Sequence, residues 1–346
     1  MADSFFRLGP EWVLRAVEAA GLRPTGHVTA LTCLENRVHD VHLEDGSHVV
    51  VKFYRPGRWS REAILEEHRF LWALREQEIP VAAPLRFADG RTLHEAEGIH
   101  YAVWPRVGGR SPAELADPEV AILGRLLARI HSVGEALGPK HRPTLDAESF
   151  GREPLRFLED GFLPATCARR YRTAALEAAA IYERWSADVP LHAIHGDCHF
   201  GNLLHGPEGW FFLDFDDFVV GPAVQDVWML LPGRDAFAER QRAILIEAYA
   251  QFRPFDPRWL RLVEPLRALR FVRYAAWIAR RWSDPAFPSA FPHFGTEEYW
   301  ENETRDLEEQ VERIARGAEA PLPEGVREPA KPDDRELTNK DFFWDL

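Results

Sequence analysis

The stretch that decides the fold reads IHGDCHFGN at residues 194–202, followed by a short apolar segment that ends in LDFDD at residues 213–217. Three polar residues in it stand at fixed intervals: Asp197, then Asn202 five positions later, then Asp214 twelve positions beyond that. A carboxylate can accept a hydroxyl proton, while an amide oxygen and a second carboxylate can hold metal ions on phosphate groups. The order of these residues therefore predicts a site for phosphoryl transfer.

The protein-kinase pattern H-R-D-x-x-x-x-N followed by D-F-G has the same order and nearly the same spacing. We interpret the stretch as a kinase active site that uses ATP and Mg²⁺. Asp197 is the predicted catalytic base, and Asn202 and Asp214 are the predicted magnesium ligands beside the nucleotide, with Asp214 serving catalysis as well. Asp226 is expected to brace the catalytic loop through hydrogen bonds, and His195 to pack behind it.

Two further interpretations of this stretch stay open. Asp216 lies two positions after Asp214, so in an extended segment both face the same side, and Asp216 is either a third metal ligand or a structural carboxylate. Alternatively, four His and Cys residues could bind zinc, because these residue types suit that metal. They are His195, Cys198, His199 and His205. Their spacing matches no closed zinc motif, and the zinc interpretation leaves the Asp and Asn positions unexplained.

The composition bounds the class of protein. With 346 residues the chain can form two lobes, and its 46% apolar and 28% charged content is typical of a globular protein. A net charge of -13 argues against nucleic-acid binding. The absence of a long apolar run predicts no membrane span, and the first residues lack the pattern of a signal peptide. Three scattered cysteines predict no disulfide framework, so we expect a reduced, cytoplasmic protein. We also expect it to act as a monomer.

Upstream of the motif, residues 27–54 alternate between apolar and polar side chains, which predicts strands over 38–43 and 48–54 around a tight turn. Lys52 lies on one face of the second strand, and we expect it to hold the ATP phosphates. Ser60 is a suitable N-cap for a helix that ends near Gln77. On that helix Glu67 shares the apolar face and is the first choice to pair with Lys52, and Glu66, which turns further toward solvent, is the second.

Helical patterns dominate the rest of the chain. They cover residues 118–133, 173–186, 235–252 and 259–282, and the catalytic segment interrupts them as a short hairpin. The prediction is an α+β, protein-kinase-like fold of two lobes. Residues 1–106 form the nucleotide-binding lobe, 107–316 the catalytic and acceptor-binding lobe, and 317–346 a disordered tail whose apolar tip, 342–346, could dock elsewhere.

The chain resembles the aminoglycoside phosphotransferase/choline kinase superfamily. The resemblance rests on GRLLARIH at residues 124–131, on the motif at 195–202 and on DFD at 214–216. Within the superfamily, further segments are similar to a bacterial branch of serine/threonine protein kinases that act in stress responses. These segments are ENRV at 35–38, VVKFYRP at 50–56, ILEEH at 64–68, VGGR at 107–110, GPAVQD at 221–226 and RWSDPAFP at 281–288.

The resemblance implies an ATP- and Mg²⁺-dependent phosphotransferase that acts on Ser or Thr of protein substrates. The loop at residues 32–37 takes the place of the glycine-rich loop of eukaryotic kinases, which puts Cys33 and Asn36 near the nucleotide. Gly196 replaces the Arg before the catalytic Asp, and residues 214–226 are too few for a phosphorylated activation loop. The alternatives are a small-molecule kinase for an amino alcohol, sugar or aminoglycoside, and an inactive kinase-like binding module.

Overall fold

The computed structural model describes residues 5, 6 and 8–319. They form an α+β fold, with a sheet-rich N-terminal region and a helical C-terminal region, as the sequence predicted. The chain divides into two compact units. Unit 1 contains the residues up to Glu114 together with Ser132–Arg142 and Asn202–Phe218, and unit 2 contains Leu115–His131, Pro143–Gly201 and the residues from Val219 onward. Asp197 thus belongs to unit 2, and Asn202 and Asp214 belong to unit 1.

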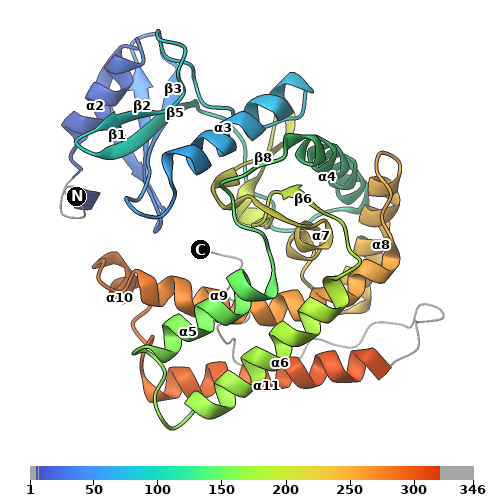
Figure 1. The fold of residues 1–346 in the computed structure, drawn as a ribbon. Helices are drawn as coiled ribbons and strands as arrows, with labels where there is room; N and C mark the ends of the chain where they lie inside the picture. The colour runs from blue at the N-terminus through green and yellow to red at the C-terminus, as the bar shows by residue number, and fades with distance from the viewer. Residues whose placement is uncertain (1–4, 7, 320–346) are drawn as a thin grey trace. The chain divides into compact units, whose positions relative to one another are not determined.

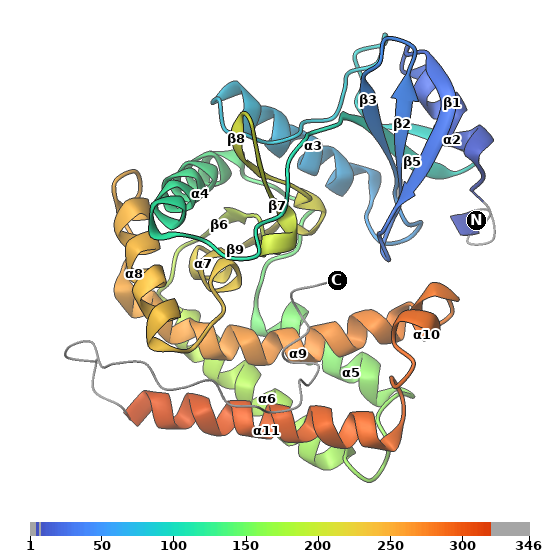
Figure 2. The same cartoon turned by 180° about the vertical axis from the view of Figure 1, so that it is seen from behind.

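A five-stranded antiparallel sheet forms the centre of the N-terminal part of unit 1, in the order β1-β2-β3-β5-β4 (Figures 1 and 2). Its strands are β1 (Pro24–Leu31), β2 (Arg37–Leu43), β3 (His48–Phe53), β4 (His94–Ala96) and β5 (Ile99–Pro105). The predicted hairpin is confirmed as β2 and β3. Its turn places Gly46 at a φ of 82°, a conformation that glycine adopts without steric cost.

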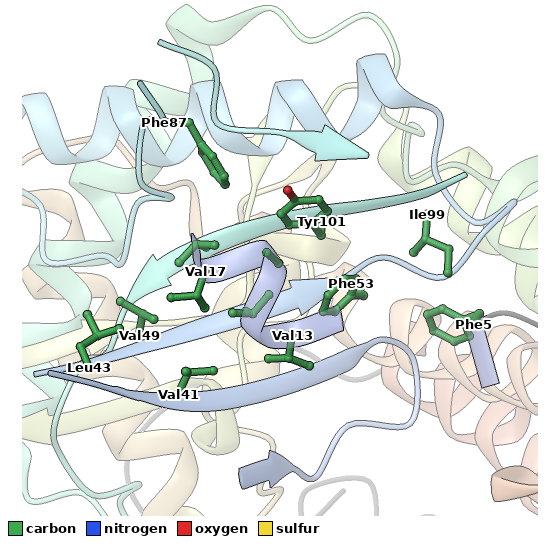
Figure 3. Packing of buried hydrophobic residues seen from close by; sticks show 13 residues of the cluster. Phe5, Val13, Val17, Val41, Leu43, Val49, Phe53, Phe87, Ile99 and Tyr101 are labelled. Carbon is green, nitrogen blue, oxygen red and sulfur yellow. The ribbon is translucent and has the colours of Figure 1, made fainter. Parts of the chain in front are cut away.

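The two faces of this sheet follow the period-two pattern. Val49, Val51 and Phe53 of β3 lie in one apolar cluster with Val13 and Val17 of the helix α2 (Pro10–Ala19), as Figure 3 shows. The intervening residues of β3 point to the opposite face, as alternation requires. There Tyr54 and Trp104 pack with Ile64 of the helix α3 (Arg61–Glu76). Lys52 therefore lies on the face that α3 covers.

The helix α3 begins where the sequence predicted it. The Ser60 hydroxyl accepts a hydrogen bond from the backbone N–H of Ala63, and the helix ends before Gln77. One expectation for this helix was wrong. Glu66 is buried instead of facing solvent, because its carboxylate accepts the backbone N–H groups of Lys140 and His141 at 2.7 and 2.9 Å. Such pairing is what allows a carboxylate to be buried.

A second hairpin in unit 1 carries part of the motif. It consists of β7 (Leu203–Gly206) and β8 (Gly209–Phe212), with a 3-10 turn at Phe200–Asn202 before it and another at Phe215–Asp217 after it. The extended geometry expected for residues 214–216 was therefore wrong. Asp214 has φ 54° and ψ 66°, and this left-handed residue turns the chain into the 3-10 conformation.

Unit 2 is mainly helical, and the predicted helices are all present. They are α4 (Asp117–Leu137), whose residues from Ser132 onward belong to unit 1, α6 (Ala168–Ser186), α8 (Ala236–Ala250) and α9 (Val263–Arg280), the last preceded by a 3-10 turn at Pro257–Leu262. Shorter elements are a π-helical turn at Glu148–Arg152, α5 (Glu153–Glu159), α7 (Val224–Leu230) and α10 (Ala286–Ala290). The strands β6 (Leu191–Ile194) and β9 (Val219–Pro222) pair antiparallel beside the catalytic loop.

The helix α11 (Glu297–Glu319) was not predicted from the sequence. It packs alongside α6 and α9 (Figure 2). Its residues Trp300, Leu307 and Ile314 recur every seven positions and are buried. Residues 317–319 form the end of this helix, and the rest of the expected tail, including 342–346, lies outside the described residues. None of the helices within residues 5, 6 and 8–319 is long and apolar enough to cross a membrane.

Candidate active site

Lys52 is the centre of a buried ionic cluster in unit 1. Its Nζ lies 3.5 Å from Glu67 Oε1, 3.2 Å from Asp214 Oδ1 and 3.2 Å from Asp216 Oδ1. Burial opposes the charge of the lysine, but Asp216, Glu67 and Asp214 outweigh that effect and raise the pKa of Lys52 well above its usual value. The strand β3 thus presents a permanently charged ammonium group to a set of carboxylates.

Glu67, and not Glu66, faces Lys52 from α3. Glu67 is almost fully buried, and its second oxygen, Oε2, accepts a hydrogen bond from the Tyr54 hydroxyl at 3.2 Å. Burial raises the pKa of Glu67 to about 7, although Lys52 and Arg142 act in the opposite direction. Glu67 therefore takes up a proton, and loses the charge that attracts Lys52, close to neutral pH.

The Asp216 carboxylate contacts three polar or charged side chains. Its Oδ2 accepts hydrogen bonds from Asn36 Nδ2 at 3.0 Å and from Arg58 Nη1, and its Oδ1 lies within ion-pair distance of Lys52. Burial alone would raise the pKa of Asp216, but Arg58, Lys52 and Arg142 lower it well below the usual range. These contacts favour the structural interpretation of Asp216 over a role as third metal ligand.

The loop at residues 32–37 contacts this cluster through the side chain of Asn36. The Asn36 side chain is fully engaged, because its Nδ2 donates to Asp216 while its Oδ1 accepts from the backbone N–H of Arg55 at 3.1 Å. Cys33 is a free, half-buried thiol whose Sγ accepts the backbone N–H of Asn36 at 3.4 Å. Burial raises the pKa of Cys33, so the thiol stays protonated and unreactive at neutral pH.

The β7–β8 hairpin brings Asn202 beside Asp214. Leu203 pairs with Phe212, and the backbone N–H of Leu213 donates to the carbonyl oxygen of Asn202 at 2.8 Å. The side chain of Asp214 is 50% exposed, unlike that of Asp216, which is 3% exposed. Asp214 is therefore the carboxylate of this cluster that can reach a ligand from solvent.

The donors at this hairpin suit magnesium. Mg²⁺ prefers oxygen ligands and is usually held by one or two carboxylates together with substrate phosphates and water. Asp214 and Asn202 offer one carboxylate and one amide oxygen, which fits that sparse arrangement. In the described part of the chain no group of three or more His, Cys, Asp or Glu residues is placed to hold a metal ion, so the zinc interpretation is not supported.

Asp197 follows β6 in unit 2, where Gly196 at φ 84° turns the chain. Its Oδ1 accepts a hydrogen bond from Arg270 Nη1 of α9 at 3.1 Å, and its Oδ2 lies 3.4 Å from His199 Nε2. Burial would raise the pKa of Asp197, but Arg270 and the neighbouring histidines lower it far below the usual range. Asp197 is thus an ionised carboxylate with 27% of its side chain exposed.

Asp226 holds the backbone of the loop that contains Asp197, as predicted from the sequence. Its carboxylate accepts the backbone N–H groups of His195 and Gly196, both at 2.8 Å. Behind it, Asp226 Oδ2 lies 2.9 Å from His131 Nε2, and His131 Nδ1 lies 2.9 Å from the Tyr249 hydroxyl. Asp226, His131, His195 and Tyr249 are buried, and burial lowers the pKa of His131, so this histidine is neutral.

Several residues that shape the ionic cluster of unit 1 or contact Asp197 in unit 2 received no role from the sequence. They are Tyr54, Arg58, His68, Arg142 and Arg270. Each reaches its partner only through tertiary structure. Two signals were present, because Tyr54 and His68 lie in the segments at 50–56 and 64–68 that carry the resemblance, and Tyr54 shares a strand face with Lys52 and so had to lie near it.

Comparisons with known proteins show the family of the chain. Residues 32–263 match the family described as "Phosphotransferase enzyme family". The chain is 42% identical over 312 residues to stress response kinase A of Escherichia coli (strain K12), covering 90% of this chain and 94% of that protein. It is 41% identical, with the same coverage, to the serine/threonine protein kinase RdoA of Salmonella typhimurium.

A solved structure gives the fold independently. The amicoumacin kinase hAmiN, in complex with AMP-PNP, Ca²⁺ and Ami, matches with a TM-score of 0.69 at 21% sequence identity. The match covers 91% of this chain and 96% of that one. At this identity the likeness concerns the fold alone, and it confirms the predicted kinase-like architecture.

Proposed function

The chain belongs to the phosphotransferase enzyme family, and from this premise we propose that it is an ATP- and Mg²⁺-dependent serine/threonine protein kinase of the bacterial stress-response type. The observation that carries the proposal is the likeness to stress response kinase A and RdoA along nearly the whole chain. That likeness includes the helical part of the chain, where phosphotransferases of one architecture differ in their acceptors. The ATP half of a site alone does not specify an acceptor.

In this proposal unit 1 binds the nucleotide. Lys52 contacts the α- and β-phosphates, and Glu67 keeps its ammonium group in place. Asn202 and Asp214 hold Mg²⁺, which neutralises charge on the phosphates when bound. Asp216 organises the cluster through Asn36, Arg58 and Lys52, and the loop around Cys33 and Asn36 covers the nucleotide.

Asp197 orients the acceptor hydroxyl and takes its proton. Its low pKa does not conflict with this role, because phosphoryl transfer passes through a loose transition state in which the hydroxyl proton leaves late. Arg270 and His199 each contact one carboxylate oxygen, and this holds the carboxylate in one orientation.

The second candidate is a small-molecule kinase, as the amicoumacin kinase with the similar fold is by its name. The charge next to Asp197 bears on one class of acceptor. Arg270 pairs with the carboxylate that would meet the acceptor. The negative charge of Asp197 is thus already balanced by a cation, so this carboxylate attracts an ammonium group beside an acceptor hydroxyl less than an unpaired one would.

Incubation with labelled ATP, Mg²⁺ and a generic basic protein tests the proposal. We expect phosphoserine or phosphothreonine with the wild type and a rate about 10²–10⁴-fold lower with Asp197→Asn. The control is Asp160→Asn, at an exposed position after α5, which should keep the wild-type rate. Label found only in a small metabolite would establish the second candidate, and no turnover of ATP at all would identify a binding module.

A further inference from the structure

A chain of hydrogen bonds lies behind the Lys52–Glu67 pair in unit 1. The Tyr54 hydroxyl donates to Glu67 Oε2 at 3.2 Å and lies 2.9 Å from His68 Nε2. On the other side of the imidazole ring, His68 Nδ1 lies 2.8 Å from Thr92 Oγ1. Tyr54, Glu67 and His68 are each at most 2% exposed, so water does not complete this chain.

While Glu67 is ionised, the chemistry of these groups allows one arrangement of protons. Burial lowers the pKa of His68 to about 3, so its ring is neutral and carries a single N–H. An ionised Glu67 only accepts, so the single proton of the Tyr54 hydroxyl points at Glu67. The Tyr54 oxygen then accepts from His68 Nε2–H, which leaves Nδ1 bare to accept from the Thr92 hydroxyl. Every donor and acceptor is satisfied in this one direction.

The arrangement determines which oxygen of Glu67 faces the lysine. The last torsion of a glutamate side chain is broad and does not by itself orient the carboxylate. With Oε2 bound to Tyr54, Oε1 is left for Lys52 Nζ. The aromatic ring of Tyr54 also lies under the ammonium group, 5.1 Å from Nζ to the ring centroid.

Resting on the function proposed above, we propose that Tyr54 and His68 are positioning residues of the phosphotransfer reaction. His68 orients the Tyr54 hydroxyl, the hydroxyl orients the Glu67 carboxylate, and the carboxylate places Lys52 for the phosphates. Neither residue touches the substrate itself. They determine the strength of the Lys52–Glu67 pair and the pH range in which this pair forms.

The pH range follows from the charges around Glu67. Lys52 of β3 and Arg142, which follows α4, favour its ionised form, whereas Asp214 and Asp216 after β8 and burial itself oppose it. The Tyr54 hydroxyl donates to the carboxylate and so also favours the ionised form. Without this hydroxyl the pKa of Glu67 rises further above about 7, and the pair with Lys52 forms only at higher pH.

The test is Tyr54→Phe, which removes the hydroxyl and keeps the ring beneath Lys52. We expect the KM for Mg-ATP at pH 7 to rise about tenfold, the size of one hydrogen bond to a charged group. We also expect the acidic limb of kcat/KM to move upward by about one pH unit, so that activity recovers at higher pH. A role in packing alone would leave the pH profile where it is.

The matched control is Tyr101→Phe. Tyr101 lies in β5 opposite Phe53, in the cluster on the other sheet face (Figure 3). Its hydroxyl makes no hydrogen bond within the described residues, so both the KM and the pH profile should stay unchanged. His68→Gln and His68→Leu form a second pair, because Gln keeps an N–H donor for Tyr54 and Leu does not. We expect Gln to retain more affinity for Mg-ATP than Leu, also if Tyr54→Phe should fail to fold.

Mg-ATP affinity measured by calorimetry separates this inference from the proposed function. If the wild type transfers phosphate to protein while Tyr54→Phe, or the His68 pair where Tyr54→Phe does not fold, shows unchanged affinity and pH profile, the positioning role is wrong and the kinase assignment stands. If the wild type binds Mg-ATP but phosphorylates no protein, the acceptor assignment fails. The difference in nucleotide affinity between wild type and Tyr54→Phe still decides the role of Tyr54.

Discussion

Two buried carboxylates, one in each unit, hold candidate site residues in different ways. Glu67 in unit 1 holds a charged side chain, Lys52, whereas Asp226 in unit 2 holds the backbone N–H groups of His195 and Gly196. Each of the two carboxylates belongs to a buried network that contains a tyrosine hydroxyl and a neutral histidine. The difference lies in what the carboxylate is bound to.

This difference determines which property each carboxylate controls. Backbone amides keep their protons near neutral pH, so the hydrogen bonds from the loop to Asp226 do not depend on a titrating donor. We expect them to contribute mainly to the stability of unit 2. The Lys52–Glu67 pair depends on charge, and the pKa of about 7 for Glu67 makes it sensitive to neutral pH. We therefore expect Asp226 to act chiefly on folding and Glu67 chiefly on activity.

The largest expected effect comes from Asp226→Ala. The substitution leaves two backbone N–H groups and His131 buried without their acceptor. The free energy of unfolding should fall by about 3–5 kcal/mol, as when one partner of a buried pair is removed. Denaturant unfolding measures the loss.

Asp235→Ala is its control, because Asp235 only caps α8 by accepting the N–H of Ala238. Losing such a cap costs about 1 kcal/mol. Glu67→Gln sharpens the comparison, since the amide keeps an acceptor for Tyr54 but loses the attraction to Lys52. If Glu67→Gln proved more destabilising than Asp226→Ala, the division between folding and activity would be wrong.

An intermediate effect is expected from Arg270→Met. In the wild type burial raises the pKa of Asp197, and Arg270 is the strongest of the groups that lower it. Removing the guanidinium raises that pKa, so the base becomes protonated at mildly acidic pH. Below the limb that Glu67 causes, kcat/KM should then fall more steeply, with a second step near or above pH 4, where the wild type still has an ionised Asp197.

Arg270→Lys is the matched variant, because it keeps the positive charge while losing the planar group. It should show a much smaller shift of that step than Arg270→Met. Identical profiles for the methionine variant and the wild type would mean that Arg270 does not control the ionisation of Asp197.

The smallest effect is expected from Ser60→Ala. The Ser60 hydroxyl caps the helix that carries Glu66 and Glu67, and losing an N-cap costs about 1 kcal/mol. Thermal unfolding should show the loss, and Ser60→Thr should restore most of it. Because Glu67 lies two turns into the helix, we expect kcat to stay near the wild-type value although the melting temperature falls. A larger loss of activity than of stability would show that the helix start also sets the position of Glu67.

Local patterns explain why much of unit 1 was predictable. The alternation through β3 determined which side chains face α3, and the hydroxyl of Ser60 marked the start of that helix. Both signals act over a few residues and need no tertiary information. The order Asp197, Asn202, Asp214 identified the motif for a similar reason, since chemistry requires these residue types at this spacing.

The failures share a different cause. Glu66 was placed toward solvent because its partners, the N–H groups of Lys140 and His141, lie far along the chain. Asp216 was expected to mirror Asp214 in an extended segment, and the left-handed backbone of Asp214 removed that symmetry. Arg270 reaches Asp197 from another helix. A buried polar residue reveals its role only through its partner, and the partner is set by the fold.

The backbone of Asp214 has a consequence for which substitutions position 214 accepts. A left-handed conformation at φ 54° costs most residues about 1–2 kcal/mol, whereas glycine adopts it freely and Asn and Asp visit it often. Glycine and asparagine suit the backbone but lack the negative charge, and glutamate supplies the charge but bears the conformational cost. Conformation and charge thus restrict this position independently, and aspartate is the residue that meets both requirements.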